Sequence, residues 1–160
     1  MRPHPKESAK VLKALLRQHF PATAFSCRLG RGTGWGSLDV SWTDGPTVAA
    51  VDGIVRPFEG KGFDGRDDST YYKDARHPDG TPSGIGYLSL QRTISADLAR
   101  RCAEQVAAFY GITPPTVIPS ACGYQTVPED LPISNMIERW DTMIYRAASD
   151  RTRYARTMAP

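Results

Sequence analysis

The stretch from Asp39 to Phe58 constrains the fold of this chain more than any other part of its sequence. At its start, apolar and polar residues alternate, which predicts a strand that buries Leu38, Val40 and Trp42 on one face. The strand runs into three residues that favour a tight turn, Asp44, Gly45 and Pro46. We assign Trp42 and these turn residues to a structural motif rather than to a reactive site.

The turn leads into a predicted amphipathic helix. Thr47 is a candidate N-cap, and Pro57 stops the helix. Apolar residues recur here at the spacing of one helical face: Val51, Ile54, Val55 and Phe58. Strand and helix therefore share one apolar interior. Phe58 and Phe63, on either side of a glycine-containing loop, complete the structural motif.

Three more helices are predicted from apolar stripes at helical spacing. They cover residues 6–20, residues 95–111 and residues 135–152. Ser95 is the expected N-cap of the second. The third starts from two residues at capping-box spacing, Asn135 and Glu138.

Strands are predicted over residues 24–29 and 85–94. A further strand is expected to hold Tyr71 and Tyr72, with one ring facing in and the other facing out. Residues 112–132 carry five prolines, which predicts an irregular segment with one short strand. Together, these elements indicate the α+β class, with a small antiparallel sheet of about four strands packed by three to four helices.

The length of 160 residues suits a single domain over residues 1–160, with a core from about 9 to 150. No apolar run is long enough to span a bilayer, and the start of the chain lacks the apolar core of a secretory signal. We therefore expect a cytoplasmic protein without membrane contact. Its three cysteines do not have zinc spacing and are expected to be reduced, mostly buried thiols.

The net charge of +3 is distributed unevenly. Residues 39–79 hold nine acids against five bases, whereas both ends of the chain are basic. One candidate surface is therefore acidic and consists of Asp64, Asp67, Asp68 and Asp74. The alternative is a basic surface for nucleic acid that consists of Arg28, Arg31, Trp35, Arg151, Arg153 and Arg156.

Arg31 and Trp35 lie in a segment with glycine at every second position, residues 30–36. This segment matches neither of the glycine patterns that bind phosphate, because it runs into a strand instead of a helix. We expect a hairpin loop between two antiparallel strands. Near its tip, Arg31 and Trp35 either stack on a base or fold back over the sheet.

Catalytic patterns are missing from the sequence. It contains no Gly-x-Ser-x-Gly and no His-Glu-x-x-His element, and its aspartates do not follow the spacing of a calcium loop. We therefore expect no catalytic residues, no metal and no cofactor, although missing motifs leave a small enzyme as an alternative.

Several strings of residues resemble one known family. They are Phe20-Pro21 before a strand, Asp39-Val-Ser-Trp-Thr-Asp-Gly-Pro-Thr, Val55-Arg-Pro-Phe-Glu-Gly-Lys-Gly-Phe-Asp-Gly, Tyr71-Tyr72 and Ile144-Tyr-Arg-Ala-Ala-Ser. Over roughly residues 9–150 the chain resembles number twenty-nine in the series of large polyvalent protein associated domains. The resemblance implies a compact α+β module of phages and conjugative elements, and it supplies no catalytic residues.

This resemblance implies a non-enzymatic accessory protein of a mobile genetic element. We expect a counter-defence inhibitor, similar in action to anti-CRISPR proteins, that binds a host defence protein or nucleoprotein complex through the acidic face. It would act in the bacterial cytoplasm as a monomer or homodimer. One alternative is an accessory module that binds DNA or RNA through the basic surface, and another is a small enzyme that modifies a host target.

Overall fold

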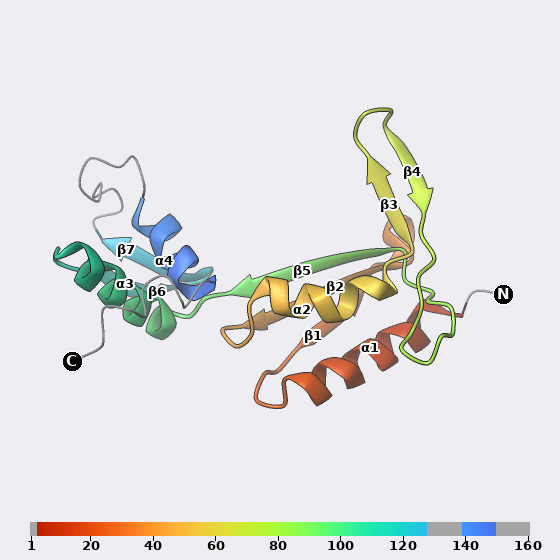
Figure 1. The fold of residues 1–160 in the computed structure, drawn as a ribbon, viewed down its shortest axis with the longest axis horizontal. Helices are drawn as coiled ribbons and strands as arrows, with labels where there is room; N and C mark the ends of the chain where they lie inside the picture. The colour runs from red at the N-terminus through yellow and green to blue at the C-terminus, as the bar shows by residue number, and fades with distance from the viewer. Residues whose placement is uncertain (1–2, 128–138, 150–160) are drawn as a thin grey trace. The chain divides into compact units, whose positions relative to one another are not determined.

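The structure, a computed structural model, describes residues 3–127 and 139–149. The chain divides into two compact units, with the boundary between Arg92 and Thr93 (Figure 1). The α+β class is confirmed, with the strands of the described residues distributed over three small sheets instead of one. Cooperative folding of both units as one domain stays a prediction.

The first unit holds two helices and five strands among its described residues. In chain order these are α1 (Pro5–His19), β1 (Ser26–Leu29), β2 (Ser37–Thr43), α2 (Val48–Val55), β3 (Lys61–Asp64), β4 (Ser69–Tyr72) and β5 (Tyr87–Thr93). A three-stranded sheet has the order β1-β2-β5, and β1 runs antiparallel to β2. The other two strands, β3 and β4, form a separate antiparallel hairpin.

The strand, turn and helix predicted around Trp42 are all present. Asp44 and Gly45 both have positive φ, 56° and 57°, which makes the turn tight. The indole Nε1 of Trp42 donates a hydrogen bond to the carbonyl oxygen of Pro46 at 3.0 Å. Thr47 caps α2 by accepting from the amide of Ala50 at 3.2 Å.

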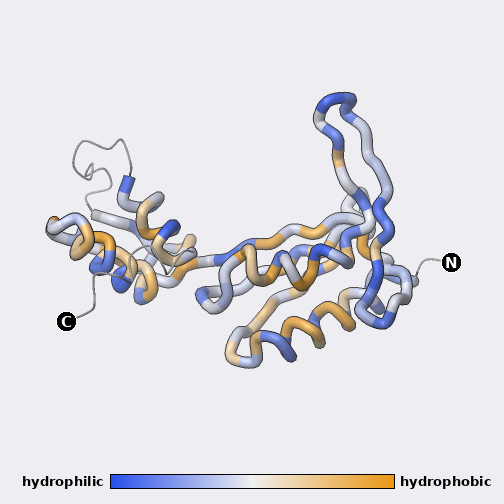
Figure 2. The backbone as a smooth tube through the Cα atoms, viewed as in Figure 1, coloured by the Kyte–Doolittle hydropathy of each residue, from blue (hydrophilic) through white to orange (hydrophobic). Residues whose placement is uncertain are grey.

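The predicted apolar interior of this unit is confirmed. It consists of Leu12, Leu16, Leu38, Val40, Trp42, Val51, Val55, Phe58 and Ile85, with Ile54 packed against it in a partly buried position. Figure 2 shows the hydrophobic residues of the sheet and of the helices that supply this cluster. Phe63, which we assigned to the structural motif, has a side chain that is 60% exposed and belongs to neither core cluster.

The β3–β4 hairpin projects from the three-stranded sheet, and its tip is strongly hydrophilic (Figures 1 and 2). The prediction that one of its two tyrosines faces inward is wrong, because Tyr71 is 49% exposed and Tyr72 is 67% exposed. The physical reason is that every residue of β4 is exposed, so the hairpin offers no interior to either ring.

The second unit contains α3 (Ala96–Tyr110), β6 (Thr116–Ser120), β7 (Gly123–Val127) and α4 (Trp140–Ser149). Ser95 caps α3, as predicted, and Gly111 ends it with a φ of 66°. The proline-rich segment forms an antiparallel pair, β6 with β7, where one strand was predicted. The predicted capping box, Asn135 and Glu138, lies outside the described residues.

A separate apolar cluster stabilises the second unit. Small residues of α3 allow its close contact with α4, and the larger side chains come mainly from α4. The buried members of the cluster are Ile94, Ala96, Ala99, Cys102, Ala103, Val106, Ala107, Val117, Trp140, Met143, Ile144, Ala147 and Ala148.

Candidate functional site

The glycine-rich loop between β1 and β2 holds Trp35 at the surface of the first unit. Residues 32–34 form a 3-10 turn, and the hydroxyl of Ser37 donates to the carbonyl oxygen of Gly34 at 2.7 Å. Gly36 has a φ of 84°, which a larger residue rarely adopts. The loop leaves the Trp35 side chain 64% exposed.

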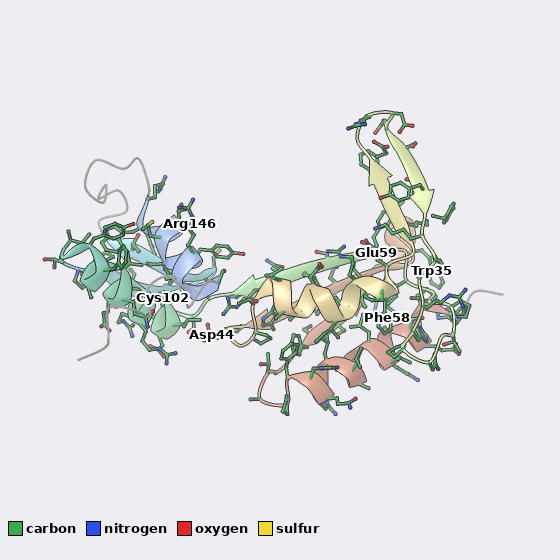
Figure 3. All side chains as sticks on the ribbon, viewed as in Figure 1. Trp35, Asp44, Phe58, Glu59, Cys102 and Arg146 are labelled. Carbon is green, nitrogen blue, oxygen red and sulfur yellow. The ribbon has the colours of Figure 1, made fainter. Side chains whose placement is uncertain are left out.

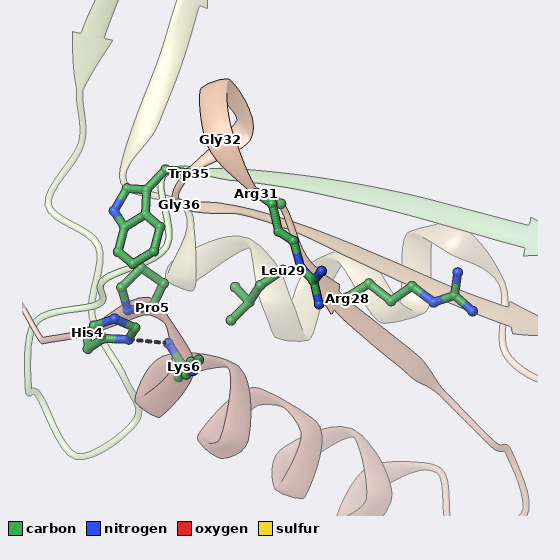
Figure 4. Close-up of a pocket in the computed structure, with 10 residues that line it drawn as sticks. His4, Pro5, Lys6, Arg28, Leu29, Arg31, Gly32, Trp35 and Gly36 are labelled. Carbon is green, nitrogen blue, oxygen red and sulfur yellow. Dashed lines mark hydrogen bonds between the residues drawn. The ribbon is translucent and has the colours of Figure 1, made fainter.

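Trp35 is positioned by the beginning of α1. Its ring meets the ring of His4 edge to face, with centroids 5.1 Å apart and planes at 84°. His4 is itself the N-cap of α1, and its Nδ1 accepts a hydrogen bond from the amide of Lys6 at 3.2 Å. Figure 4 shows the Trp35 indole above His4 and Pro5. The loop and the helix end thus form one local structure.

A cavity of about 500 Å³ lies on one side of Trp35. Its lining residues come from the start of α1, the end of β1 and the glycine-rich loop: His4, Pro5, Lys6, Arg28, Leu29, Gly30, Arg31, Gly32, Trp35 and Gly36. Figure 4 shows Arg28 and Arg31 on one side of this cavity, with Trp35, His4 and Lys6 on the other. The lining therefore combines three permanent cations with an exposed aromatic ring.

A second cavity, of about 430 Å³, adjoins the first. The two share His4, Pro5, Trp35 and Gly36, and the second adds Lys61 and Tyr72 from the β3–β4 hairpin. None of the described residues that line either cavity is acidic. We name the pair of cavities around Trp35 the basic groove. Its charge favours an anionic ligand.

Asp39 is an acidic neighbour of the basic groove. It stands opposite Arg28 in the register of the β1–β2 pair. No ion pair among the described residues joins the side chains of Arg28 and Asp39. Arg28 is exposed, so its guanidinium remains available to a ligand while the Asp39 carboxylate weakens the local positive field.

Glu59 stabilises the base of the β3–β4 hairpin (Figure 3). Its Oε2 accepts from Lys73 Nζ at 2.7 Å and from Arg56 Nη1 at 3.0 Å, and its Oε1 accepts from the amide of Leu88 at 3.1 Å. Burial alone would raise the pKa of Glu59, but the hydrogen bonds from Lys73, Leu88 and Arg56 outweigh it and lower that pKa. A buried carboxylate thus connects the hairpin to β5.

The structure places the predicted acidic residues in two locations. Asp64, Asp67 and Asp68 lie at or beside the turn between β3 and β4, and all three are exposed. Asp64 and Asp67 accept from the amides two residues later, at 3.0 and 3.2 Å. Asp74 follows β4 at the other end of the hairpin and pairs with Arg76 at 3.0 Å.

The predicted basic residues are brought together in part. Arg28, Arg31 and Trp35 share one cavity, although sequence analysis did not include His4, Lys6, Lys61 or Tyr72 with them. No local pattern marks these four, because they come from a helix end and a hairpin distant in the sequence. Arg151, Arg153 and Arg156 lie outside the described residues.

A hydrogen-bond chain that is buried at Ser8 and His77 and exposed at Thr81 and Asp79 has the residue types of a hydrolytic triad. His77 Nε2 lies 2.8 Å from Ser8 Oγ, and His77 Nδ1 lies 2.9 Å from Thr81 Oγ1, which donates to Asp79 at 2.7 Å. Ser8 also accepts from the amide of Gly84 at 2.9 Å and is fully buried. An enclosed hydroxyl does not reach a substrate. The hydrogen bonds of Ser8 instead connect α1 to the loop before β5.

All three cysteines are free, but only Cys102 is buried, whereas most were expected to be. Burial raises the pKa of the Cys27 thiol, against an opposing effect of Lys13, and so disfavours the nucleophilic thiolate.

Within residues 3–127 and 139–149, no group of three or more potential ligands could hold a metal ion. The helices of these residues are also too short or too polar to cross a membrane.

Comparison with known proteins identifies the family. The model of large polyvalent protein associated domain 29 matches residues 4–95, which is more than half of the chain and ends close to the boundary between the units. The match stops before the Ile144 string, so the resemblance extends less far than the predicted residues 9–150. No curated protein and no solved structure gives a significant match. The chain therefore belongs to the large polyvalent protein associated domain 29 family, whose members are associated with phages and mobile genetic elements.

Proposed function

We propose that this mobile-element protein is an accessory factor that binds nucleic acid in the basic groove. The observation that supports this proposal most strongly is the lining of the two cavities, which includes Lys6, Arg28, Arg31 and Lys61 and no acidic residue among the described ones. Phosphate groups are recognised by such clusters of cations, and arginine binds them with two donors at once.

The exposed ring in the groove favours nucleic acid over a small anion. Trp35 borders both cavities, so a ligand that occupies both lies beside its exposed ring. A base can stack on the indole while its neighbouring phosphates meet Arg31 on one side and Lys61 on the other. A free phosphate ion would use only the charges.

The proposal is tested by fluorescence anisotropy of a labelled oligonucleotide with the full chain. The double variant Arg28→Gln/Arg31→Gln should bind at least about tenfold more weakly, because two phosphate contacts are lost. The matched control is Lys10→Gln/Arg17→Gln, which changes the net charge equally at exposed positions of α1 that line neither cavity. Equal affinities for these two variants would contradict the proposed site.

A variant that adds affinity gives an independent check. Asp39→Asn removes the carboxylate opposite Arg28 without changing the size of the side chain. It should tighten binding about two- to threefold, in line with the energy of an exposed charge pair. Unchanged affinity of Asp39→Asn would mean that nucleic acid does not approach this side of the sheet, and weaker binding would contradict the proposed groove.

A second candidate function uses the tip of the projecting hairpin. Asp64, Asp67 and Asp68 gather there and are exposed, so they can mimic phosphate groups and occupy the basic channel of a host defence complex. In this counter-defence role the protein would act in the bacterial cytoplasm. The separation of Asp74 from the tip makes this acidic surface smaller than the sequence suggested.

The two candidates are separated by a triple variant, Asp64→Asn/Asp67→Asn/Asp68→Asn. Asparagine still accepts the turn hydrogen bonds that Asp64 and Asp67 make, so the turn is retained while three charges are lost. For phosphate mimicry, this variant loses inhibition of a CRISPR effector complex. For the basic groove, its affinity for the oligonucleotide stays the same or rises slightly.

A further inference from the structure

One face of the β3–β4 hairpin carries aromatic rings and a lysine. Side chains alternate between the two faces of a strand, and Lys61 pairs with Tyr72 and Phe63 with Thr70. These four side chains therefore share a face. Phe63 and Tyr72 are both more than half exposed, so their rings are accessible to a ligand.

Tyr87 of β5 extends the same face. Its hydroxyl lies 3.2 Å from Thr70 Oγ1, and its ring centroid lies 5.6 Å from Lys61 Nζ. Lys61 Nζ also lies 5.8 Å from the ring centroid of Tyr72, so one ammonium group contacts two rings. We name Phe63, Tyr72 and Tyr87, with Lys61 between them, the aromatic face.

The aromatic face continues from the basic groove. Lys61 and Tyr72 line the second cavity together with His4 and Trp35. An extended ligand that leaves the first cavity over Trp35 therefore reaches the Tyr72 ring. This order places the exposed rings of Trp35 and Tyr72 between the arginines of the first cavity and the lysine of the hairpin.

Charge on the hairpin is separated between its faces. Asp64 pairs with Ser69 and shares the reverse face with Gly62 and Tyr71. The aromatic face, by contrast, includes no acidic residue among its described members. A polyanion is therefore attracted to the aromatic face and repelled from the turn, which limits its path to the base of the hairpin.

We propose that the ligand of the basic groove is a single strand, whose unpaired bases stack on Trp35 and then on Tyr72. This inference rests on the proposed function and deepens it by naming the strand type and the hairpin contact. A duplex hides the faces of its bases inside the stack, whereas unpaired bases expose them to aromatic side chains. DNA and RNA share this chemistry.

The test compares single strands with the matching duplex, in DNA and RNA forms of about ten nucleotides. Anisotropy with the full chain should show single strands bound at least about tenfold more tightly than the duplex, and the DNA and RNA arms identify the preferred sugar. Tyr72→Ala should weaken single-strand binding about tenfold, Tyr72→Leu nearly as much, and Tyr72→Phe hardly at all. Tyr145→Ala, which removes an exposed tyrosine of α4, is the matched control.

The outcomes distinguish the single-strand inference from the proposed nucleic-acid binding on which it rests. If single strands and duplex bind equally and Tyr72→Ala has no effect, the single-strand inference is wrong while nucleic-acid binding stands. If neither form binds, both fail. Equal affinity of Tyr72→Leu and wild type would show that the face offers apolar area rather than ring stacking, which also overturns the inference.

Discussion

Trp35 and His4 meet edge to face, with their ring centroids 5.1 Å apart, although one lies in the glycine-rich loop and the other caps α1. The contact joins the two parts of the chain that line both cavities of the basic groove. It fixes the orientation of an exposed indole before any ligand arrives. Such pre-organisation reduces the conformational entropy lost on binding.

His4→Ala should therefore weaken oligonucleotide binding about threefold, because Trp35 must then be ordered on binding. The helix loses a cap that contributes about 1 kcal/mol. Quenching of tryptophan fluorescence by acrylamide should increase, since Trp35 moves more freely. His19→Ala, at the exposed end of the same helix, is the control and should leave affinity and quenching unchanged. A loss of affinity in both variants would point to general helix damage.

Glu59→Gln should destabilise the protein by about 1–3 kcal/mol, because it removes the charge from three hydrogen bonds to a buried group. The base of the hairpin should loosen first, because Glu59 joins Lys73, directly after β4, to Leu88 in β5. Urea unfolding measures the loss, and hydrogen exchange at β3 and β4 locates it. Asp97→Asn breaks an exposed ion pair with Arg100 and should cost almost nothing.

The same carboxylate predicts how stability depends on pH. The pKa of Glu59 is lower in the folded chain than the ordinary value of about 4.5, so the unfolded chain binds the proton more readily. Its contribution is therefore complete above about pH 4.5 and is lost as the pH falls through the lowered pKa. The free energy of unfolding, measured by urea from pH 6 downward, should decline less steeply in Glu59→Gln than in wild type. Equal slopes would contradict the assignment.

Alanine substitutions at two glycines, one in the turn before α2 and one within α2, should change the stability in opposite directions. Gly45 has a φ of 57°, and a Cβ there would collide with the Thr23 side chain, so Gly45→Ala should destabilise by at least about 1–2 kcal/mol. Gly53 lies in α2 with open space around it, and Gly53→Ala should stabilise by about 0.5–1 kcal/mol. Thermal unfolding of both variants measures the two signs. Stabilisation by Gly45→Ala would show that the turn differs from the one described.

The single-domain prediction has its own test, because each unit has a separate apolar cluster. Hydrogen exchange monitored in increasing urea follows α2 in one unit and α3 in the other. Folding as one domain predicts that both helices lose protection at the same urea concentration. Loss of protection in α3 well before α2 would mean two independently folding domains.

Local patterns predicted much of the first unit. The alternation around Val40 and Trp42, the Asp44–Gly45 turn and the Thr47 cap each depend on neighbours in sequence, and all are present. The orientation of Tyr71 and Tyr72 was predicted wrongly because alternation assumes that one face of a strand is covered. The sequence does not show that β3 and β4 form a hairpin separate from the three-stranded sheet.

The candidate site was predicted only in part for a similar reason. Arg28, Arg31 and Trp35 are close in sequence, and they share a cavity. The contribution of His4 depends on where α1 begins relative to the loop, and that of Tyr72 depends on the position of the hairpin. Both are long-range arrangements that residue spacing does not encode.

Salt dependence of binding tests the central claim most directly. Lys6, Arg28, Arg31 and Lys61 line the groove, so four phosphate contacts with a single strand predict a slope of log affinity against log salt of about −3 for wild type. The Arg28→Gln/Arg31→Gln variant should show about half that slope. A slope near zero, or the same slope in wild type and variant, would contradict nucleic-acid binding in the basic groove.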